Sequence, residues 1–298
     1  MNSQRYLNPE ILARITRLGF KARRVVEGSI SGQHRSPMHG VSVEFADYRE
    51  YAPGDDLKRI DWRAYARSNR FQIKRYEEES NLRCTILVDA SRSMSYQPKE
   101  ATRQSKFAYA ATIATSLAAL LVQQRDAVGM AIFDADERLF MRSAATQAQL
   151  ARIIDSLEET KPERTTELGS VMMKVCDQIR SRGVVLILSD LLTDLDAFYK
   201  AIGRYQYAGH EMIVMHILDP DEIDMPFNDS VLFKDIEGDE ELHAEPWAFR
   251  KAYKKAMEDF VAEVGRRCRF ANVDHVLMRT DEDLGLALSH YLHRRLRG

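Results

Sequence analysis

The chain has 298 residues, of which 45% are hydrophobic and 30% charged, and its formal net charge is −2. This length allows one large domain or two ordinary ones, and the composition is typical of a soluble globular protein. A net charge so close to zero excludes a general attraction of the whole chain to nucleic acid or to an anionic membrane.

Cysteine usage and the N-terminus bear on the cellular compartment. Cys84, Cys176 and Cys268 are far apart and form no C-x-x-C pair, so we expect reduced, mostly buried thiols. The N-terminus is polar and Arg-rich, without the apolar run of a signal peptide. The uncharged stretch Phe107–Val122 is short for a bilayer span and favours a buried helix. Together these features predict a cytoplasmic protein without a membrane span.

The first 80 residues lack a regular alternation of strands and helices. A helix is expected over Pro9–Glu27, within an N-terminal segment 1–27. Residues 28–80 are rich in Gly, Tyr, Arg and Asp, with extended pieces at Val41–Phe45 and Phe71–Tyr76. We interpret residues 28–80 as a small β-rich module that packs beside the following domain.

Arginine and tyrosine residues interleave in this module, as they do on some sheets that bind single-stranded nucleic acid. Acidic neighbours reduce the positive charge, because residues 1–80 hold 15 Lys and Arg against 11 Asp and Glu. A salt-bridged interface is therefore favoured over nucleic-acid binding, and Trp62 is expected to be a packing anchor. The interleaved residues are Arg49, Arg59, Arg63, Arg67, Arg70, Arg75, Tyr48, Tyr51, Tyr65 and Tyr76.

From residue 81 to residue 298, short apolar runs alternate with helical patterns. The runs predicted to be strands are Cys84–Val88, Val128–Phe133, Val184–Leu188, Ile213–Leu218 and His275–Met278. The segments predicted to be helices are Ser105–Gln124, Gln147–Glu158, Glu167–Arg180, Asp196–Tyr207, Trp247–Arg267 and Asp283–Arg295. The runs are apolar throughout, as in parallel strands buried on both faces. The sequence therefore predicts an α/β domain with a doubly wound, mostly parallel sheet.

An acidic insertion interrupts this domain at residues 219–245. It holds 11 Asp and Glu and a single Lys. Such a charge run is typical of a solvated loop, and we expect one here.

Oxygen-bearing side chains follow the predicted strands at the points where those strands end. Asp89, Ser91 and Ser93 follow the first strand with the spacing D-x-S-x-S. The pair Thr165–Thr166 opens a later helix, and Ser189–Asp190 follows a later apolar strand. In an open α/β sheet, ligands bind at the carboxyl ends of the strands, and Mg²⁺ prefers oxygen ligands. The sequence therefore predicts a magnesium site at this edge.

This arrangement resembles the metal-ion-dependent adhesion site of von Willebrand factor A domains, which have a Rossmann-like fold. The resemblance implies that Ser91 and Ser93 bind the cation directly and that Thr166 binds it directly or through water. It also implies that Asp89 and Asp190 act largely through bound waters. Because three of these five ligands are neutral hydroxyls, we expect weak binding of Mg²⁺ or Mn²⁺ in the free protein.

Two features of the threonine loop bear on this resemblance. The Thr-Glu-Leu-Gly spacing favours Thr166 over Thr165 as the ligand. Arg164 stands where these domains commonly carry a glycine, so the loop is expected to be tighter or differently hydrated. The family also implies an open position on the cation, which takes an acidic side chain from a partner protein.

Several blocks in the same order resemble a bacterial family called domain of unknown function 58. They are Ala22–Gly28, Gly32–Pro37, Glu44–Tyr51, Pro53–Asp56, Ile60–Trp62, Tyr65–Arg67 and Gly209–Glu211. Proteins of that family are typically associated with MoxR-type AAA+ ATPases, which are thought to mature protein complexes. The resemblance implies a protein-interaction module that binds such an ATPase, or a client protein that presents an acidic residue.

The familiar catalytic motifs do not occur in this sequence. Ser91 stands where a phosphatase with an aspartyl nucleophile would carry a second Asp, and there is no G-x-S-x-G, P-loop or H-E-x-x-H motif. We therefore predict that the protein is not an enzyme. Two alternatives stay open: an Mg²⁺-dependent hydrolase that uses the same cation as a Lewis acid, and a nucleic-acid-binding adaptor.

Overall fold

A computed structural model describes residues 5–22, 43–50, 65, 71–78, 82–98, 103–229, 231–234 and 241–297. The chain divides into two compact units, one of Met1–Arg24 with Leu82–Gly298 and the other of Val25–Asn81. The second unit contains a two-stranded antiparallel sheet of β1 (Val43–Glu50) and β2 (Gln72–Glu78).

Much of what the sequence predicts for the second unit lies outside the described residues. This holds for Trp62, for the arginines between Arg59 and Arg70, and for most of the blocks that resemble the bacterial family. Within the described part, the ring of Tyr65 stacks on Phe71 with a centroid separation of 4.4 Å.

The first unit is built on a six-stranded sheet. Its strands are β3 (Arg83–Asp89), β4 (Ala127–Phe133), β5 (Glu137–Ala144), β6 (Val184–Ser189), β7 (Glu211–Leu218) and β10 (Asp274–Arg279). They lie in the order β10-β7-β6-β3-β4-β5, and all neighbours are parallel except β4 and β5. The order places β3 at the centre, with the later strands β6, β7 and β10 on one side and β4 and β5 on the other, as in a doubly wound sheet. The predicted mostly parallel α/β architecture is confirmed.

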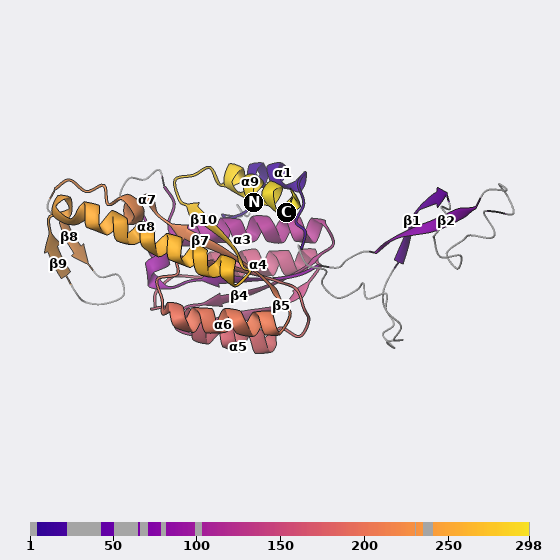
Figure 1. Ribbon diagram of the computed structural model, residues 1–298, viewed down its shortest axis with the longest axis horizontal. Helices are drawn as coiled ribbons and strands as arrows, with labels where there is room; N and C mark the ends of the chain where they lie inside the picture. The colour runs from indigo at the N-terminus through magenta and orange to yellow at the C-terminus, as the bar shows by residue number, and fades with distance from the viewer. Residues whose placement is uncertain are drawn as a thin grey trace. The chain divides into compact units, whose positions relative to one another are not determined.

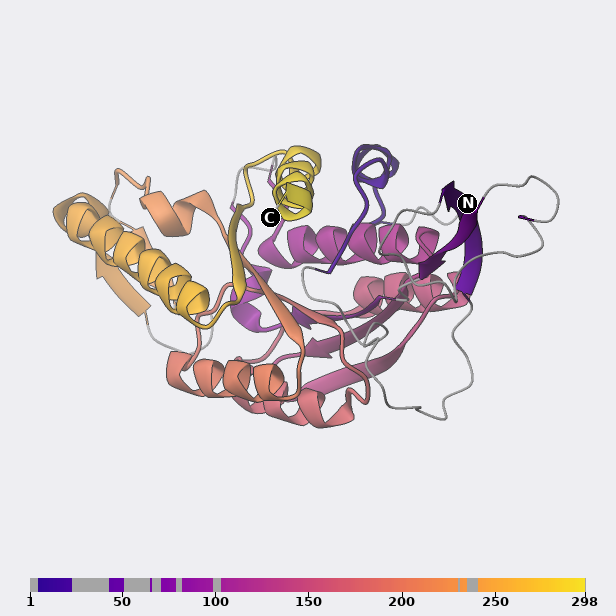
Figure 2. The same ribbon diagram turned by 45° about the vertical axis from the view of Figure 1, so that its right-hand side comes forward.

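Helices cover both faces of this sheet (Figures 1 and 2). They are α1 (Pro9–Thr16), α3 (Lys106–Gln123), α4 (Gln147–Glu159), α5 (Leu168–Gln178), α6 (Leu195–Tyr207), α8 (Pro246–Phe270) and α9 (Leu284–Arg297). On one face lie α3, α4 and α9, with α1 packed against α3 and α9. On the other face α5 packs against α6, and α8 contributes Val264 and Cys268 to the same core.

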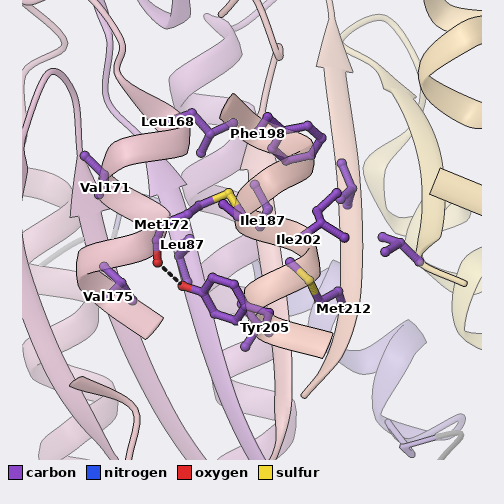
Figure 3. Packing of buried hydrophobic residues seen from close by; sticks show 14 of the residues in the cluster. Leu87, Leu168, Val171, Met172, Val175, Ile187, Phe198, Ile202, Tyr205 and Met212 are labelled. Atoms are coloured by element: carbon purple, nitrogen blue, oxygen red, sulfur yellow. Dashed lines mark hydrogen bonds between the residues drawn. The ribbon is translucent and has the colours of Figure 1, made fainter. Parts of the chain in front are cut away.

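The core on the α5–α6 face shows why the two helices pack so closely (Figure 3). The Tyr205 hydroxyl, fully buried, donates a hydrogen bond to the backbone oxygen of Met172 across the helix pair (2.9 Å). Gly169 faces α6 so closely that a Cβ atom there would lie 2.6 Å from the Cβ of Ala197. The absence of a side chain at Gly169 therefore sets the spacing of the two helices.

Helix α3 is the one helix in the described part of the chain whose length and hydropathy match a membrane span, and 94% of that span is buried inside the unit. Ser105 caps its N-terminus by accepting a hydrogen bond from the backbone N–H of Ala108 (3.2 Å). The prediction of a buried helix over this stretch is confirmed. The three cysteines are also buried and free, as expected.

Two local predictions were wrong, and one strand was not predicted. Helix α1 ends at Thr16, because the chain turns through Gly19 with φ +71°. Strand β5 was missed, because an edge strand with partly exposed residues lacks the continuous apolar run of its neighbours. The acidic insertion is partly ordered: it holds the short helix α7 (Pro220–Asp224) and the hairpin of β8 (Val231–Lys234) and β9 (Glu241–Ala244).

Candidate functional site

The predicted metal ligands lie at the carboxyl ends of two neighbouring parallel strands. Asp89 is the last residue of β3, and Asp190 comes directly after β6. The helices that follow β3 and β6 lie on opposite faces of the sheet, so this edge is the switch point where open α/β sheets bind ligands. Ser91 and Ser93 follow Asp89 at a short 3₁₀ turn, Arg92–Ser95.

Asp89 is fully buried and bound on both carboxylate oxygens. Its Oδ1 accepts a hydrogen bond from the Ser91 backbone N–H (2.9 Å), and its Oδ2 accepts one from the Ser189 hydroxyl (2.6 Å). Burial and repulsion from Asp190 raise the pKa of Asp89 well above its ordinary value, although these hydrogen bonds act in the opposite direction. A positive charge at this position would relieve both penalties.

The two serines of the D-x-S-x-S segment point their hydroxyls at each other. Ser91 Oγ and Ser93 Oγ are 3.0 Å apart, and both residues are buried. The Ser93 hydroxyl also acts to lower the pKa of Asp190, which favours the charged form of that carboxylate. Two hydroxyl oxygens and two carboxylates therefore meet at this edge of the sheet.

The threonine loop is tied against this cluster through its backbone. The Arg92 backbone N–H donates to the Arg164 carbonyl (2.6 Å), and the Glu167 N–H donates to the carbonyl of Asp134 (3.2 Å). Thr166, between these two anchors, has a buried Oγ1 without a hydrogen-bond partner among the described residues. Thr165 is exposed. An unpaired buried hydroxyl is costly, so of the two threonines Thr166 is the one whose hydroxyl has unmet hydrogen-bonding capacity among the described residues.

Lys106 is the charged neighbour that the sequence did not reveal. Its side chain is fully buried, and its Nζ lies 2.7 Å from Asp190 Oδ2 and 2.5 Å from Glu222 Oε1 of α7. Burial opposes the charged form, but the two carboxylates outweigh it and raise the pKa of Lys106 above its ordinary value. Burial likewise acts to raise the pKa of Asp190, but the ammonium outweighs it and the pKa is lowered. Both groups therefore stay charged.

Two histidines form a chain of hydrogen bonds that ends at the backbone oxygen of Asp190. His216 Nε2 lies 2.8 Å from the backbone oxygen of Asp190, and His275 Nε2 lies 3.4 Å from His216 Nδ1. Burial lowers the pKa of His216 to about 3 and that of His275 to about 4, so both rings are neutral near pH 7. Because a carbonyl can only accept, His216 carries its proton on Nε2 and accepts the bond from His275 on Nδ1.

The charge balance at this edge favours an added cation. Asp190 and Glu222 share the ammonium of Lys106, and Asp89 lies close enough to Asp190 for repulsion to raise its pKa. In the described ranges no three His, Cys, Asp or Glu side chains are grouped to hold a metal ion; the donors here are hydroxyls and two carboxylates. That set, with the unpaired Thr166 oxygen, fits a hard cation such as Mg²⁺ and not a soft metal.

Comparison with known proteins places the chain in a family. Residues 47–262 match the family described as protein of unknown function DUF58. The chain belongs to this family. The DUF58 match begins in β1 and ends in α8, so it spans both units and includes the whole candidate site.

Uncharacterized relatives accompany this family match. The uncharacterized protein Rv1480 of Mycobacterium tuberculosis is 24% identical over 294 residues, covering 98% of this chain and 92% of that protein. A protein of Mycobacterium bovis has the same identity and coverage. An uncharacterized protein of Mycobacterium avium is 26% identical over 172 residues, covering 55% of this chain and 90% of that protein.

Solved structures show weaker likeness. The DUF58 chain resembles an aerotolerance-related membrane protein from Bacteroides fragilis, with 15% identity, a TM-score of 0.48, and coverage of 72% of this chain and 98% of that chain. It also resembles the conserved hypothetical protein BatB from Bacteroides thetaiotaomicron, with 16% identity, a TM-score of 0.47, and coverage of 73% and 100%.

Proposed function

We propose that this chain is a non-enzymatic protein-interaction module of the von Willebrand factor A type, whose cation-dependent site captures an acidic side chain of a partner. The observation that carries this proposal is the buried, unpaired Oγ1 of Thr166, on a loop held against the D-x-S-x-S segment. A hydroxyl in that state is poised to bind a ligand that the described residues do not supply.

The arrangement of the sheet supports this proposal. Strands β3 and β6 are parallel neighbours, so their carboxyl ends lie side by side. The parallel pairing of the two strands is therefore enough to bring Asp89 and Asp190 close together. The proposed likeness to von Willebrand factor A domains rests on this order and on the five side chains at the ends of these strands and on the threonine loop.

The residues divide the work of holding a cation. Ser91, Ser93 and Thr166 would offer neutral hydroxyl oxygens, while Asp89 and Asp190 would supply the negative charge. When bound, Mg²⁺ or Mn²⁺ would offer a free coordination position to an incoming carboxylate. The Ser189 hydroxyl and Ser91 backbone N–H orient Asp89, and Lys106 with His216 fixes Asp190.

A MoxR-type AAA+ ATPase is the expected partner, on the strength of the family resemblance and the family match. A carboxylate bound to a cation gains strength once water is excluded, because the local dielectric falls. Binding of that ATPase, or of an acidic client protein, should therefore require Mg²⁺ or Mn²⁺. The module should work in the cytoplasm, where Mg²⁺ is abundant.

A pull-down with a purified MoxR-type ATPase tests the proposal. The wild-type chain in Mg²⁺ should retain the ATPase, whereas wild type in EDTA and Ser91→Ala/Ser93→Ala in Mg²⁺ should lose it. The matched control is Ser156→Ala/Ser289→Ala, two serines on α4 and α9 away from the site. Undiminished binding in EDTA and in the site variant would place the interface elsewhere.

A further inference from the structure

A second candidate site lies at the opposite end of the same strands. A cavity of about 220 Å³ opens between the first residues of β3 and β6, the last residues of β5 and the C-terminus of α5. Arg83, where β3 begins, lies on its wall. The extended chain from Arg83 to Asp89 spans about 20 Å, so this cavity is distinct from the cation site.

Positive charge dominates the polar part of the wall. Arg83, Arg142 and Arg180 line the cavity, and no aspartate or glutamate is among its described lining residues. Arg83 donates a hydrogen bond to the Ser181 hydroxyl, and no carboxylate pairs with it among the described residues. For Arg142 and Arg180 no ion pair is found within the described ranges. By contrast, Arg204 and Arg295 each lie on a carboxylate.

The end of helix α5 does not account for this cluster. Cations near a helix C-terminus compensate the helix dipole, and Arg180 follows Ile179, the C-cap of α5. The interaction with the helix dipole acts only within the last turn of the helix, so it accounts for Arg180 alone. Arg83 and Arg142 come from strands β3 and β5 instead, so three chain segments bring arginines to one cavity.

A buried histidine adds an unpaired nitrogen. His210 is only 3% exposed and forms part of the wall, and its Nδ1 has no hydrogen-bond partner among the described residues. Burial lowers the pKa of this ring, so it is neutral near pH 7. In a neutral imidazole one nitrogen donates and the other accepts, so Nδ1 can form a hydrogen bond in either tautomer. A ligand hydroxyl would satisfy it.

The remaining walls limit the size and polarity of the occupant. Phe140, Ile179 and Val184 give an apolar surface, and Ser143 and Gln178 add neutral hydrogen-bonding groups. The volume is below the range of drug-sized ligand pockets, roughly 300–1,000 Å³. It suits a compact molecule that carries a doubly charged oxyanion and at least one hydroxyl.

We propose that this cavity binds a small hydroxylated phosphate monoester, with its phosphate on Arg83, Arg142 and Arg180. Guanidinium groups match the oxygens of phosphate in a bidentate geometry. A phosphate monoester carries both negative charges on one compact group, whereas a dicarboxylate such as malate divides them between two separate groups. The proposal is independent of the cation site at the other end of the strands.

Isothermal titration of the full chain with glycerol 3-phosphate tests it, with inorganic phosphate and malate as comparison probes at matched ionic strength. Wild type should bind glycerol 3-phosphate more tightly than inorganic phosphate, and malate least. Arg142→Gln/Arg180→Gln should weaken binding of the phosphate monoester at least about tenfold, since two charge-assisted hydrogen-bonding groups are lost. The single variants Arg142→Gln and Arg180→Gln should each have an affinity between those of wild type and the double variant.

The matched control is Arg17→Gln/Arg152→Gln, which removes the same charge from the same unit at two arginines that are exposed, as Arg142 and Arg180 are, but do not line the cavity. It should bind like wild type, as should Ser91→Ala/Ser93→Ala. No binding by wild type at millimolar glycerol 3-phosphate, or equal weakening in the two arginine pairs, would overturn the proposal. Preference for malate would overturn the assignment to phosphate. Circular dichroism of each variant checks the fold, and the single variants serve if the pair misfolds.

Discussion

The ammonium of Lys106 lies 2.7 Å from Asp190 Oδ2, and neither side chain is exposed to solvent. The ammonium of Lys106 thus already compensates part of the negative charge at the proposed cation site. Lys106 lowers the negative charge that Mg²⁺ would meet, and through Glu222 it ties the site to α7. If the proposed site binds a cation, we expect that binding to be weak in the free protein, because Lys106 competes with the cation and three of the proposed ligands are neutral hydroxyls.

Replacement of Lys106 tests that competition. Lys106→Met should cost about 3–5 kcal/mol of unfolding free energy in EDTA, because two buried carboxylates lose their partner. Mg²⁺ should recover part of that loss, so the variant should gain more melting temperature from Mg²⁺ than wild type does. Lys174→Met, at an exposed pair with Asp136, is the control and should change little. An unchanged Mg²⁺ response would contradict the competition.

The two threonines should differ in their effects on stability and on Mg²⁺ response. Thr166→Val removes an unpaired buried hydroxyl, so in EDTA it should leave stability unchanged or raise it by up to about 1 kcal/mol. The same variant should lose the Mg²⁺-dependent rise in melting temperature. Thr165→Val, at an exposed position, should retain it. The reverse ranking would move the ligand to Thr165.

Two glycines in adjacent helices give a matched test of helix packing. Gly169→Ala should destabilise by about 1–3 kcal/mol, because its Cβ would lie 2.6 Å from the Cβ of Ala197. At Gly203 of α6, an added Cβ would have no atom within 4 Å, so Gly203→Ala should stabilise by up to about 1 kcal/mol. Urea unfolding measures both. Equal effects would show that α5 and α6 can separate freely.

The carboxyl group of Asp126 should make the free energy of unfolding depend on pH. It accepts a hydrogen bond from the Leu82 backbone N–H (2.9 Å), and burial raises its pKa to about 6 from 3.8. The unfolded chain therefore releases this proton first as pH rises, and stability falls between about pH 4 and pH 6. In Asp126→Asn, the free energy of unfolding should fall by about 1 kcal/mol less over this pH range than in wild type. This figure is reduced to allow for the partial exposure of Asp126.

Urea midpoints of the Asp126 variant and wild type across about pH 4 to 7, the range in which the raised pKa acts, give the measurement. Asp155→Asn, at an exposed position of α4, is the control and should follow the wild-type profile. A constant difference between Asp126→Asn and wild type across this range would exclude Asp126 as the titrating group.

The architecture of the first unit was predictable because its central strands are buried on both faces. Every residue of β6 and β7 is buried, and such runs stand out in a sequence. Strand β5 is an edge strand with mixed exposure, so its pattern resembles that of a loop. Helix α7 was missed because its capping box, formed by Asp219 and Glu222, stood within a run of acidic residues.

The candidate site was predictable only in part. Asp89 and Asp190 follow strong strand signals, so their meeting follows from parallel pairing of β3 and β6. Lys106 is the first residue of a helix that is otherwise apolar. This pattern draws attention to the lysine but does not identify its partner. Its contact with Asp190 spans 84 residues of sequence. Such through-space pairs depend on the final packing of helix against sheet and cannot be derived from local patterns.

The first unit is assembled from both ends of the chain, and this has a consequence for biosynthesis. Arg295 of α9 donates a hydrogen bond to the Lys21 carbonyl (2.6 Å) and lies over the ring of Phe20. Arg14 of α1 pairs with Asp283 beside α9 (2.9 Å). Because a ribosome delivers α1 before α9, α1 waits for the synthesis of the residues between them before its docking surface is complete. During that interval the part of α1 that packs against α9 stays uncovered.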